Sequence, residues 1–427
     1  MGIWRKAVIG GMCAAAIMSA PAAMAETYVP LRAQAVRESV GVNTHIRYTD
    51  GAYARISDVI RALDYLDVRH VRDSVPRVAA GGGLPLAEYI WMNKAGIRFN
   101  LIIGGGDYDP ANAITGLERL EAARPGAIES IEGFNEVNNE PVTYKGETSL
   151  ESAIAAHEET VRRLRAHPAL GRIPIFDLTG NDIPPVLGDR GDYHNSHVYA
   201  QNGDQPGGWM RKDQRADDKP WVITEFGYAS NPQSGWLVIG VGETEQAKGL
   251  LNGILDAAQY GASRIYLYEL LDEKPDPEGR LNEMHFGLFA FDSRPKPAAR
   301  ALRNLLRIIA DSDPAALSFT PQPLDVAIEG APESLHVLAL QKASGVTGLV
   351  LWNEVGFWDR EHGRPVENAP VPVKVTLPLG AEAKALYDPL LQDGPLLQDG
   401  AAVHPFGSGR ELTVDVPDHP VIIEIRR

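Results

Sequence analysis

The chain has 427 residues, with 41 Lys and Arg against 56 Asp and Glu, so its formal net charge is −15 at pH 7. This balance disfavours nucleic acid and acidic polysaccharides as ligands, because a surface of that sign repels polyanions. The single cysteine, Cys13, lies in an N-terminal leader-like segment, which excludes a disulfide, a thiolate metal site and a cysteine nucleophile from the rest of the chain. We expect a monomer without a cofactor.

The first 25 residues have the layout of a cleavable signal peptide. Arg5 and Lys6 precede an apolar run over residues 7–17, and a small-x-small sequence at residues 23–25 ends the segment. The apolar run is shorter than the roughly 20 residues of a membrane-spanning helix, and no later stretch qualifies. The sequence therefore predicts a signal peptide over residues 1–25, no membrane span in the mature protein, and a secreted or periplasmic location.

Residues 26–312 are predicted to form a (β/α)8 TIM barrel. Short apolar runs alternate there with amphipathic helical stretches such as residues 56–66, whose apolar side chains recur every three or four positions. Closing eight such units into a barrel covers both faces of the parallel strands. The predicted strands are residues 40–43, 68–72, 98–103, 128–133, 173–178, 196–199, 221–225 and 265–268. The predicted helices include residues 56–66, 86–95, 111–123, 150–166, 244–259 and 297–310.

Residues 313–427 are predicted to form a small antiparallel β-sandwich domain. Helical periodicity stops after the barrel, and alternating apolar runs with turn residues replace it. Examples are residues 335–340, 348–352, 371–377 and 421–425. The sequence Pro-Leu-Leu-Gln-Asp-Gly occurs twice in succession at residues 389–400, and we assign it no chemistry.

Two glutamates lie at the C-terminal ends of predicted barrel strands, which is where barrel enzymes carry their chemistry. Glu136 follows the fourth predicted strand and Glu225 ends the seventh. Cleavage of a glycosidic bond needs one carboxyl group to protonate the leaving group and a second to attack the sugar or to activate water. Strands four and seven lie on opposite sides of an eight-stranded barrel, so these two carboxyl groups can flank a sugar ring.

The residues at four predicted strand ends resemble the motifs of the retaining glycoside hydrolases of clan A. The matching motifs are Arg72 at strand two, Asn135-Glu136 at strand four, His197-Val198-Tyr199 at strand six and Thr224-Glu225-Phe226-Gly227-Tyr228 at strand seven. Within the clan, the chain resembles family-39-like or family-5-like members that end in a β-sandwich. The phrases that carry this finer resemblance are Asn43-Thr44-His45, Gly287-Leu288-Phe289 and Lys296-Pro297-Ala298-Ala299.

The resemblance implies a role for each matched residue. Glu225 would be the nucleophile, kept ionised by Arg72 and Tyr199, because a positive charge and a hydroxyl donor favour the carboxylate. Glu136 would be the acid/base, and its pKa would be raised because it faces that negative charge. Asn135 would hydrogen-bond the sugar 2-hydroxyl group.

Further substrate-binding candidates follow from their positions at strand ends. Asn43 and His45 follow the first strand, and His197 belongs to the sixth. Many clan members supply a tryptophan from strand eight, but this chain has none there, so Tyr268 or Glu269 is expected to line the sugar site instead. His194 and His197 could bind a metal ion, but no third ligand has convincing spacing, so no metal is expected.

The sequence offers a second candidate for the acid/base residue. Asn139-Glu140 is also an Asn-Glu pair, but spacing favours Glu136, because the fourth strand ends near Gly133. Glu132, which lies within that strand, is expected to be structural.

The expected activity is hydrolysis of a β-linked, neutral or weakly charged oligo- or polysaccharide by double displacement. A bacterial exopolysaccharide is one candidate substrate. The alternatives are a carbohydrate-binding protein that has lost turnover and a transglycosylase that uses the same residues.

Overall fold

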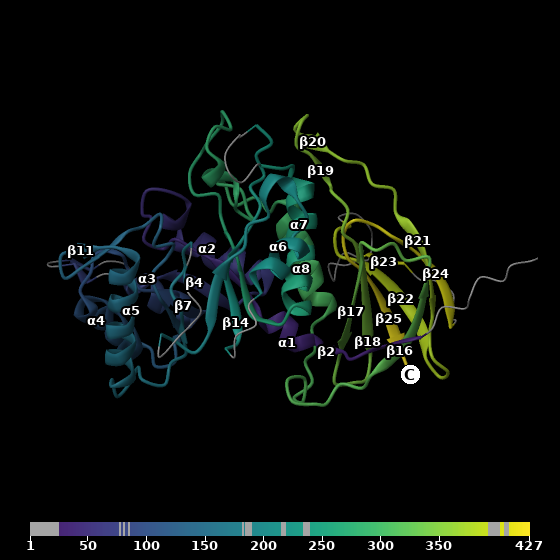
Figure 1. The fold of residues 1–427 in the computed structure, drawn as a ribbon, viewed down its shortest axis with the longest axis horizontal. Helices are drawn as coiled ribbons and strands as arrows, with labels where there is room; N and C mark the ends of the chain where they lie inside the picture. The colour runs from purple at the N-terminus through teal and green to yellow at the C-terminus, as the bar shows by residue number, and fades with distance from the viewer. Residues whose placement is uncertain are drawn as a thin grey trace, which may run out of the picture.

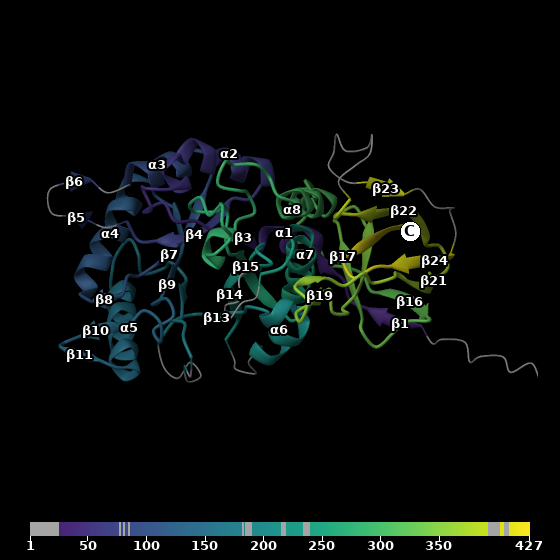
Figure 2. The same cartoon turned by 90° about the horizontal axis from the view of Figure 1, so that it is seen from above.

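The computed structural model describes residues 25–76, 78–79, 82–83, 86–181, 183, 190–214, 219–233, 240–391, 402–404 and 410–427. The predicted signal peptide lies outside the described residues except for Ala25, and the duplicated segment is described only as far as Leu391. Figures 1 and 2 show two bodies side by side, a strand barrel surrounded by helices and a β-sandwich. This is the predicted fold, a TIM barrel followed by a β-sandwich.

Eight parallel strands form the barrel, in the order β12-β9-β7-β4-β3-β15-β14-β13. The barrel closes between β12 and β13, where Phe176 bridges Tyr193 and the Asp177 N–H donates to the Tyr193 carbonyl over 3.1 Å. In chain order the strands are β3 (Val40–Asn43), β4 (His70–Ser74), β7 (Arg98–Ile102), β9 (Ile128–Glu132), β12 (Ile175–Phe176), β13 (His194–His197), β14 (Trp221–Phe226) and β15 (Ala262–Leu267).

The sixth strand is displaced by two residues from its predicted range. The sequence predicts residues 196–199, whereas β13 ends at His197, because its backbone pairs with β14 from His194 opposite Trp221 onward. Pairing with a neighbour, rather than local composition, sets where a short strand begins. As a result Tyr199 lies beyond the strand, on the loop at the C-terminal end of the barrel.

The helices follow the predicted ranges closely, because each has an apolar stripe that packs on the barrel. Where a cap is present it marks the start: Asp109 accepts from the Ala111 N–H over 3.0 Å at the beginning of α4. The helices are α1 (Ala33–Glu38), α2 (Ile56–Leu66), α3 (Leu86–Lys94), α4 (Pro110–Ala123), α5 (Leu150–Arg165), α6 (Gly207–Asp213), α7 (Glu243–Gln259), α8 (Pro297–Ile308), and the 3-10 turns η1 (Ala52–Ala54), η2 (Gln201–Gly203) and η3 (Asn282–His285). None of the described helices is both long and apolar enough to cross a membrane.

The β-sandwich consists of two sheets, with orders β1-β16-β21-β24 and β2-β17-β18-β25-β22-β23. Its strands are β1 (Glu26–Tyr28), β2 (Leu31–Arg32), β16 (Leu324–Glu329), β17 (Leu335–Gln341), β18 (Thr347–Asn353), β21 (Val371–Thr376), β22 (Glu382–Asp388), β23 (Ala402–His404), β24 (Glu411–Val416) and β25 (Val421–Arg426). Small ribbons elsewhere are β5 (Val78–Ala79), β6 (Gly82–Gly83), β8 (Gly106–Asp107), β10 (Val142–Tyr144), β11 (Glu147–Thr148), β19 (Trp358–Asp359) and β20 (Arg364–Pro365).

Two sandwich strands come from the range that the sequence assigns to the barrel. β1 pairs antiparallel with β16, and β2 pairs parallel with β17, so residues 26–32 extend both sandwich sheets. The physical reason is that both partner strands have free edges, whereas the barrel strands have none once the barrel is closed. The chain therefore passes from the sandwich into the barrel and back again.

The larger sandwich sheet is buried on both faces. Leu349 and Leu351 of β18 face the core between the two sheets, while Val350 and Trp352 belong to the core shared with the barrel helices. This alternation follows from the two-residue period of a strand. In Figures 1 and 2 the outer face of this sheet lies against α7 and α8, and we refer to this contact as the joint.

Candidate active site

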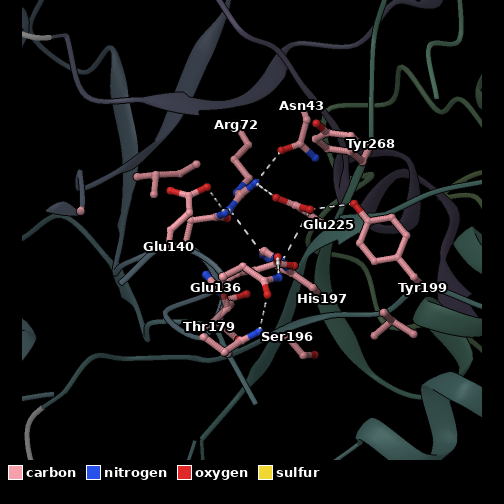
Figure 3. Close-up of a pocket in the computed structure, with 18 of the residues that line it drawn as sticks. Asn43, Arg72, Glu136, Glu140, Thr179, Ser196, His197, Tyr199, Glu225 and Tyr268 are labelled. Carbon is pink, nitrogen blue, oxygen red and sulfur yellow. Dashed lines mark hydrogen bonds and ion pairs between the residues drawn. The ribbon is translucent and has the colours of Figure 1, made fainter. Parts of the chain in front are cut away.

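The C-terminal ends of the barrel strands surround an open cavity of about 800 Å³. Asn43, Arg72, Glu136, His197 and Glu225 line it and come from five different strand ends. Figure 3 shows these side chains directed into the same space. The barrel thus brings together residues that lie up to 182 positions apart in the sequence, counted from Asn43 to Glu225.

Arg72 is the centre of the buried part of this site. Its guanidinium donates to both Glu132 oxygens, over 2.8 and 2.7 Å, and to Glu225 Oε1 over 2.5 Å. Burial by itself lowers the pKa of Arg72, but the two carboxylates more than offset this, so the pKa is raised and the guanidinium stays charged. Arg72 thus neutralises two buried carboxylates at once.

Glu132, expected to be structural, points inward below the cavity and has no exposed surface. Besides Arg72, Asn100 Nδ2 and Thr224 Oγ1 donate to its oxygens, over 2.5 and 3.0 Å. Burial raises the pKa of Glu132, but the Arg72 charge and these hydrogen bonds lower it below its usual range. Glu132 therefore orients Arg72 from beneath.

Glu225 is held by two donors from different strands. Arg72 Nη1 contacts Oε1, and the Tyr199 hydroxyl donates to Oε2 over 2.7 Å (Figure 3). Burial raises the pKa of Tyr199 well above its ordinary value, and the Glu225 charge raises it further, so the phenol remains a donor. These are the two partners that the sequence motifs imply for Glu225.

Glu136 lies at the rim, on the turn that follows β9. Its φ of 38° is in the left-handed region, which is uncommon for a residue with a side chain and clusters at functional sites. Two contacts position the residue: its N–H donates to Thr179 Oγ1 over 2.9 Å, and its carboxylate accepts from Asn139 Nδ2 over 2.8 Å. The strained backbone aims the carboxylate at the cavity.

His197 joins the two candidate catalytic carboxylates. Its Nδ1 is 2.8 Å from Glu136 Oε1 and 3.6 Å from Glu225 Oε2. One oxygen of each carboxylate and one His197 nitrogen all lie within 4.8 Å of one another. We call Glu136, His197 and Glu225 the mouth group.

The pKa of Glu136 is shifted in the direction opposite to the one expected from the facing charge of Glu225. The hydrogen bond with His197 is the largest effect; although burial opposes it, the His197 charge, Asn139 and Arg72 add to it and lower the pKa to about 2. The raised pKa expected from the sequence is therefore wrong for the unliganded site. The expectation considered Glu225 but not the histidine that lies between the two carboxylates.

Asn135 and Glu140 lie beside this group. Asn135 accepts from Arg72 Nη2 over 2.8 Å and donates to Glu140 Oε1 over 3.1 Å. Glu140 lines the cavity from an exposed position one turn beyond Glu136, and its contact with Asn135 links it to the site. Both Asn-Glu pairs of the sequence thus reach the cavity, but only Glu136 contacts His197.

The strand-one and strand-eight candidates divide into two sets. Asn43, which accepts from Arg72 over 2.9 Å, lines the cavity, as do His45 and Tyr268. Glu269 has no exposed surface and is not among the lining residues; it accepts from the Tyr53 hydroxyl over 2.8 Å. Both residues lie just beyond β15, which ends at Leu267, and Tyr268 is the one of the two that lines the cavity.

Glu283 is a site residue that the sequence reasoning missed. It lies on η3, lines the cavity, and accepts a hydrogen bond from the Tyr268 hydroxyl. Burial raises its pKa, and the charges of Glu225 and Glu136 raise it further. No strand-end pattern marks this position, because η3 belongs to the long connection after β15.

Three groups of His and carboxylate side chains in the described residues have ligand atoms close enough to hold a metal ion. One is the mouth group. A second consists of His45, which lines the cavity, with Glu269 and Glu273. The third, Asp256 with His336 and Glu354, lies at the joint. In the mouth group, Arg72 and Tyr199 donate to the Glu225 oxygens and Asn139 donates to Glu136 Oε2.

The fold has counterparts among solved structures. A family 39 glycoside hydrolase from the gut symbiont Bacteroides cellulosilyticus WH2 superposes with a TM-score of 0.61 at 15% identity, over 92% of this chain and 82% of that one. The chain shares this fold. A glucosidase from Croceicoccus marinus gives a TM-score of 0.57 at 12% identity, over 95% of this chain and 99% of that one. By sequence, no protein-family model and no curated protein matches.

Both similarities extend over the barrel and the sandwich together, since each covers more than nine-tenths of this chain. The two-part architecture is therefore a property of the fold, and the resemblance to glycoside hydrolases drawn from the motifs is confirmed at that level. Identities of 12 and 15% establish the fold alone. The chemistry of the site is therefore inferred from the residues of the mouth group.

Proposed function

We propose that the chain is a secreted retaining β-glycosidase, with Glu225 as nucleophile and Glu136 as acid/base. The observation that carries the proposal is the spacing of the two carboxylates, which have oxygens within 4.8 Å of each other. Retaining glycosidases place the two carboxyl groups about 5 Å apart, whereas inverting enzymes leave roughly 6.5–9.5 Å for a water molecule. A separation of this size supports the retaining rather than the inverting arrangement.

In the first step Glu225 Oε attacks the anomeric carbon while the proton of Glu136 passes to the departing glycosidic oxygen. This forms a covalent glycosyl ester. In the second step Glu136, now a carboxylate, takes a proton from water, whose oxygen attacks the same carbon and releases Glu225. Arg72 and Tyr199 donate hydrogen bonds to the two Glu225 oxygens, which orients the carboxylate as nucleophile and stabilises the negative charge that returns to it as leaving group.

Glu136 needs a proton before it can act as the acid. In the unliganded site its pKa is about 2, and the hydrogen bond with His197, over 2.8 Å, is the largest cause. A sugar ring that enters between Glu136 and Glu225 excludes water and weakens this contact, and both changes favour the neutral form of Glu136.

A β-linked, neutral or weakly charged glycan is the proposed substrate class. The net charge of the chain disfavours polyanions. The cavity, of about 800 Å³, is large enough for several sugar units rather than one. Tyr48 and Trp209 line it and offer aromatic faces to sugar rings.

A panel of aryl β-glycosides and β-linked oligosaccharides tests the proposal. Glu225→Ala is expected to abolish turnover, and Glu136→Ala to lose at least about 1,000-fold on substrates with poor leaving groups. Azide is expected to restore Glu136→Ala on substrates with good leaving groups and to yield the β-glycosyl azide, because this anion attacks the glycosyl-enzyme directly and, unlike water, needs no general base. Glu140→Gln is the matched control, with a loss below about 10-fold.

Full activity in either Glu225→Ala or Glu136→Ala would overturn the assignment. An α-glycosyl azide from Glu136→Ala would also contradict the retaining mechanism, and a larger loss in Glu140→Gln than in Glu136→Gln would move the acid role to Glu140.

One observation favours a second function, a carbohydrate-binding protein without turnover. Glu136 is held ionised at a pKa of about 2, and an ionised carboxylate cannot protonate a leaving group. Glycan binding by calorimetry with no product from any substrate of the panel would support this function. Transfer of the glycosyl group to a sugar in preference to water would identify a transglycosylase, which uses the same first step.

A further inference from the structure

The joint contains a compact group of ionisable side chains outside the proposed active site. Asp256 lies on α7, on the barrel side, while His336 lies on β17 and Glu354 follows β18, on the sandwich side. One ligand atom from each lies within 4.8 Å of the other two. We call Asp256, His336 and Glu354 the joint group. Figures 1 and 2 both show α7 beside β17.

The two carboxyl groups of this group are buried and hydrogen-bond each other. Asp256 has no exposed surface, and apart from the Glu354 carboxyl group no donor of the described residues hydrogen-bonds its oxygens. Glu354 Oε1 is likewise buried without a donor within the described part of the chain. A buried carboxylate without a donor costs several kcal/mol, so such atoms are retained where something else satisfies them.

The spacing of the atoms fits a cation. His336 Nδ1 is 3.4 Å from Asp256 Oδ1, and His336 Nε2 is 3.3 Å from Glu354 Oε2. Ligand atoms about 2.1 Å from a tetrahedral zinc ion are about 3.4 Å apart. The two distances start from different nitrogens of the ring, and an imidazole binds a given ion through one of them, so a cation here would be held by one His336 nitrogen with one oxygen each from Asp256 and Glu354, atoms that lie within 4.8 Å of one another.

The neighbours of His336 also suit a ligand. The ring packs on Trp352, with centroids 5.0 Å apart, and Gln259 Oε1 lies 3.4 Å from Nδ1. Burial lowers the pKa of His336, and the neutral ring that results is the form that binds metals. Its side chain keeps 13% of its surface exposed, which leaves a route from solvent.

One positive charge lies nearby on the barrel side. Arg211 of α6 is exposed, and its guanidinium donates to the Tyr260 hydroxyl over 2.9 Å. An exposed charge that is already paired opposes a cation only weakly. Within the described residues, the two carboxylates of the joint group therefore determine the sign of the local charge.

We propose that the joint group binds one divalent cation of the zinc class and so fastens the sandwich to helix α7 of the barrel. An imidazole with two carboxylates is a ligand set for zinc and related first-row ions, and calcium or magnesium would require more oxygen ligands. The fourth position would be taken by water, reached from the His336 side. Because α7 directly follows the loop after β14, the cation would stiffen the part of the barrel that carries Glu225.

Zinc binding to the whole, tag-free chain tests the proposal. The protein is stripped with chelator, dialysed against micromolar Zn²⁺, and its metal content and melting temperature are measured. We expect one zinc ion per chain bound at the joint, with a rise in melting temperature of roughly 3–5 °C at a 100-fold excess over Kd. Asp256→Asn and Glu354→Gln are expected to lower the affinity at least about 100-fold and to abolish the rise.

The controls separate this site from the other acidic groups. Glu136→Gln alters the mouth group and is expected to retain both the zinc ion and the rise in melting temperature. Co²⁺ in place of zinc is expected to give the visible absorption of a tetrahedral ion, lost in Asp256→Asn but present in Glu136→Gln. Since Asp256→Asn preserves the size of the side chain, a circular dichroism spectrum like that of the unmodified chain verifies its fold.

Two results would overturn the proposal. The first is an absence of zinc binding in the stripped protein, or equal binding by Asp256→Asn. The second is a loss of zinc in Glu136→Gln with retention in Asp256→Asn, which would assign the ion to the mouth group. Neither result bears on glycoside cleavage, which is measured separately.

Discussion

The mouth group and the joint group have the same composition, one histidine and two carboxylates within 4.8 Å, but their carboxylates differ in pKa. At the mouth, the pKa of Glu136 is lowered to about 2, chiefly by its hydrogen bond with His197. At the joint, burial raises the pKa of Asp256 to about 7, and burial together with Asp256 raises that of Glu354 to about 8. The pKa values of similar side chains are therefore shifted in opposite directions in two regions of one molecule.

The difference comes from the surrounding donors. The mouth group is built around the buried guanidinium of Arg72, and Tyr199 and Asn139 donate to its carboxylates. The joint group has no such buried cation among the described residues, and the hydrogen bond of Asp256 is with Glu354, a second buried acid. A buried carboxylate is ionised where charge and donors accompany it and neutral, or bound to a metal, where they do not. Variants that remove donors from the mouth group test this explanation.

Arg72→Met is expected to have the largest effect. Loss of the guanidinium leaves Glu132 and Glu225 buried without a counter-charge, which costs about 3–5 kcal/mol of unfolding free energy, and activity falls to background. Urea denaturation and the glycoside panel measure the two losses. Arg61→Met, at an arginine with 71% of its side chain exposed, is the control and is expected to change stability by less than about 0.5 kcal/mol. Equal stability of the two variants would contradict the role of Arg72.

His197→Phe tests the cause of the low pKa at the mouth. Without the imidazole, the pKa of Glu136 is expected to rise from about 2 toward its ordinary value of 4.5, because the largest lowering effect is removed. A ¹³C NMR titration of the glutamate carboxyl groups follows this change. Asn139→Ala removes a smaller contribution and is expected to give a smaller rise. If the two variants shifted the pKa equally, His197 would not be the principal cause.

Asp418→Asn sharpens the comparison within the joint itself. Burial raises the pKa of Asp418, but His419, Asn368 and Lys248 more than offset it and lower the pKa to about 2; Lys248 Nζ lies 3.0 Å away. A pKa lowered in the fold gives stability that is present above the unfolded value of 3.8 and is lost as the pH falls through about 2. The substitution is therefore expected to cost about 2 kcal/mol at pH 6.

The measurement is the unfolding free energy of the two proteins between pH 6 and pH 2. The difference is expected to shrink across this range, because protonation of Asp418 removes the same interaction in the unmodified chain. A difference that stays constant with pH would show that the side chain contributes by packing rather than by charge.

Much of the fold could be predicted because its signals are local. The apolar period of α2 over residues 56–66, the alternation in β18 and the order of the four strand-end motifs are all properties of short stretches. The same is true of Arg72 and Glu225, whose partnership follows once each is placed at the end of a parallel strand.

The parts that sequence reasoning missed depend on neighbours distant in the chain. The limits of β13 are set by pairing with β14, and β1 and β2 join the sandwich because free sheet edges lie there. The low pKa of Glu136 requires the position of His197, 61 residues away. Glu283 reaches the cavity from a connection without a regular pattern.

The sequence by itself determined the barrel, the sandwich and the identity of the candidate carboxylates, because hydrophobic period and strand-end position are written in short segments. Only the tertiary structure decided which carboxylate is charged. Charge depends on donors within a few ångströms, and those donors come from other strands at the mouth and, for Asp418 at the joint, from Lys248 of the other domain.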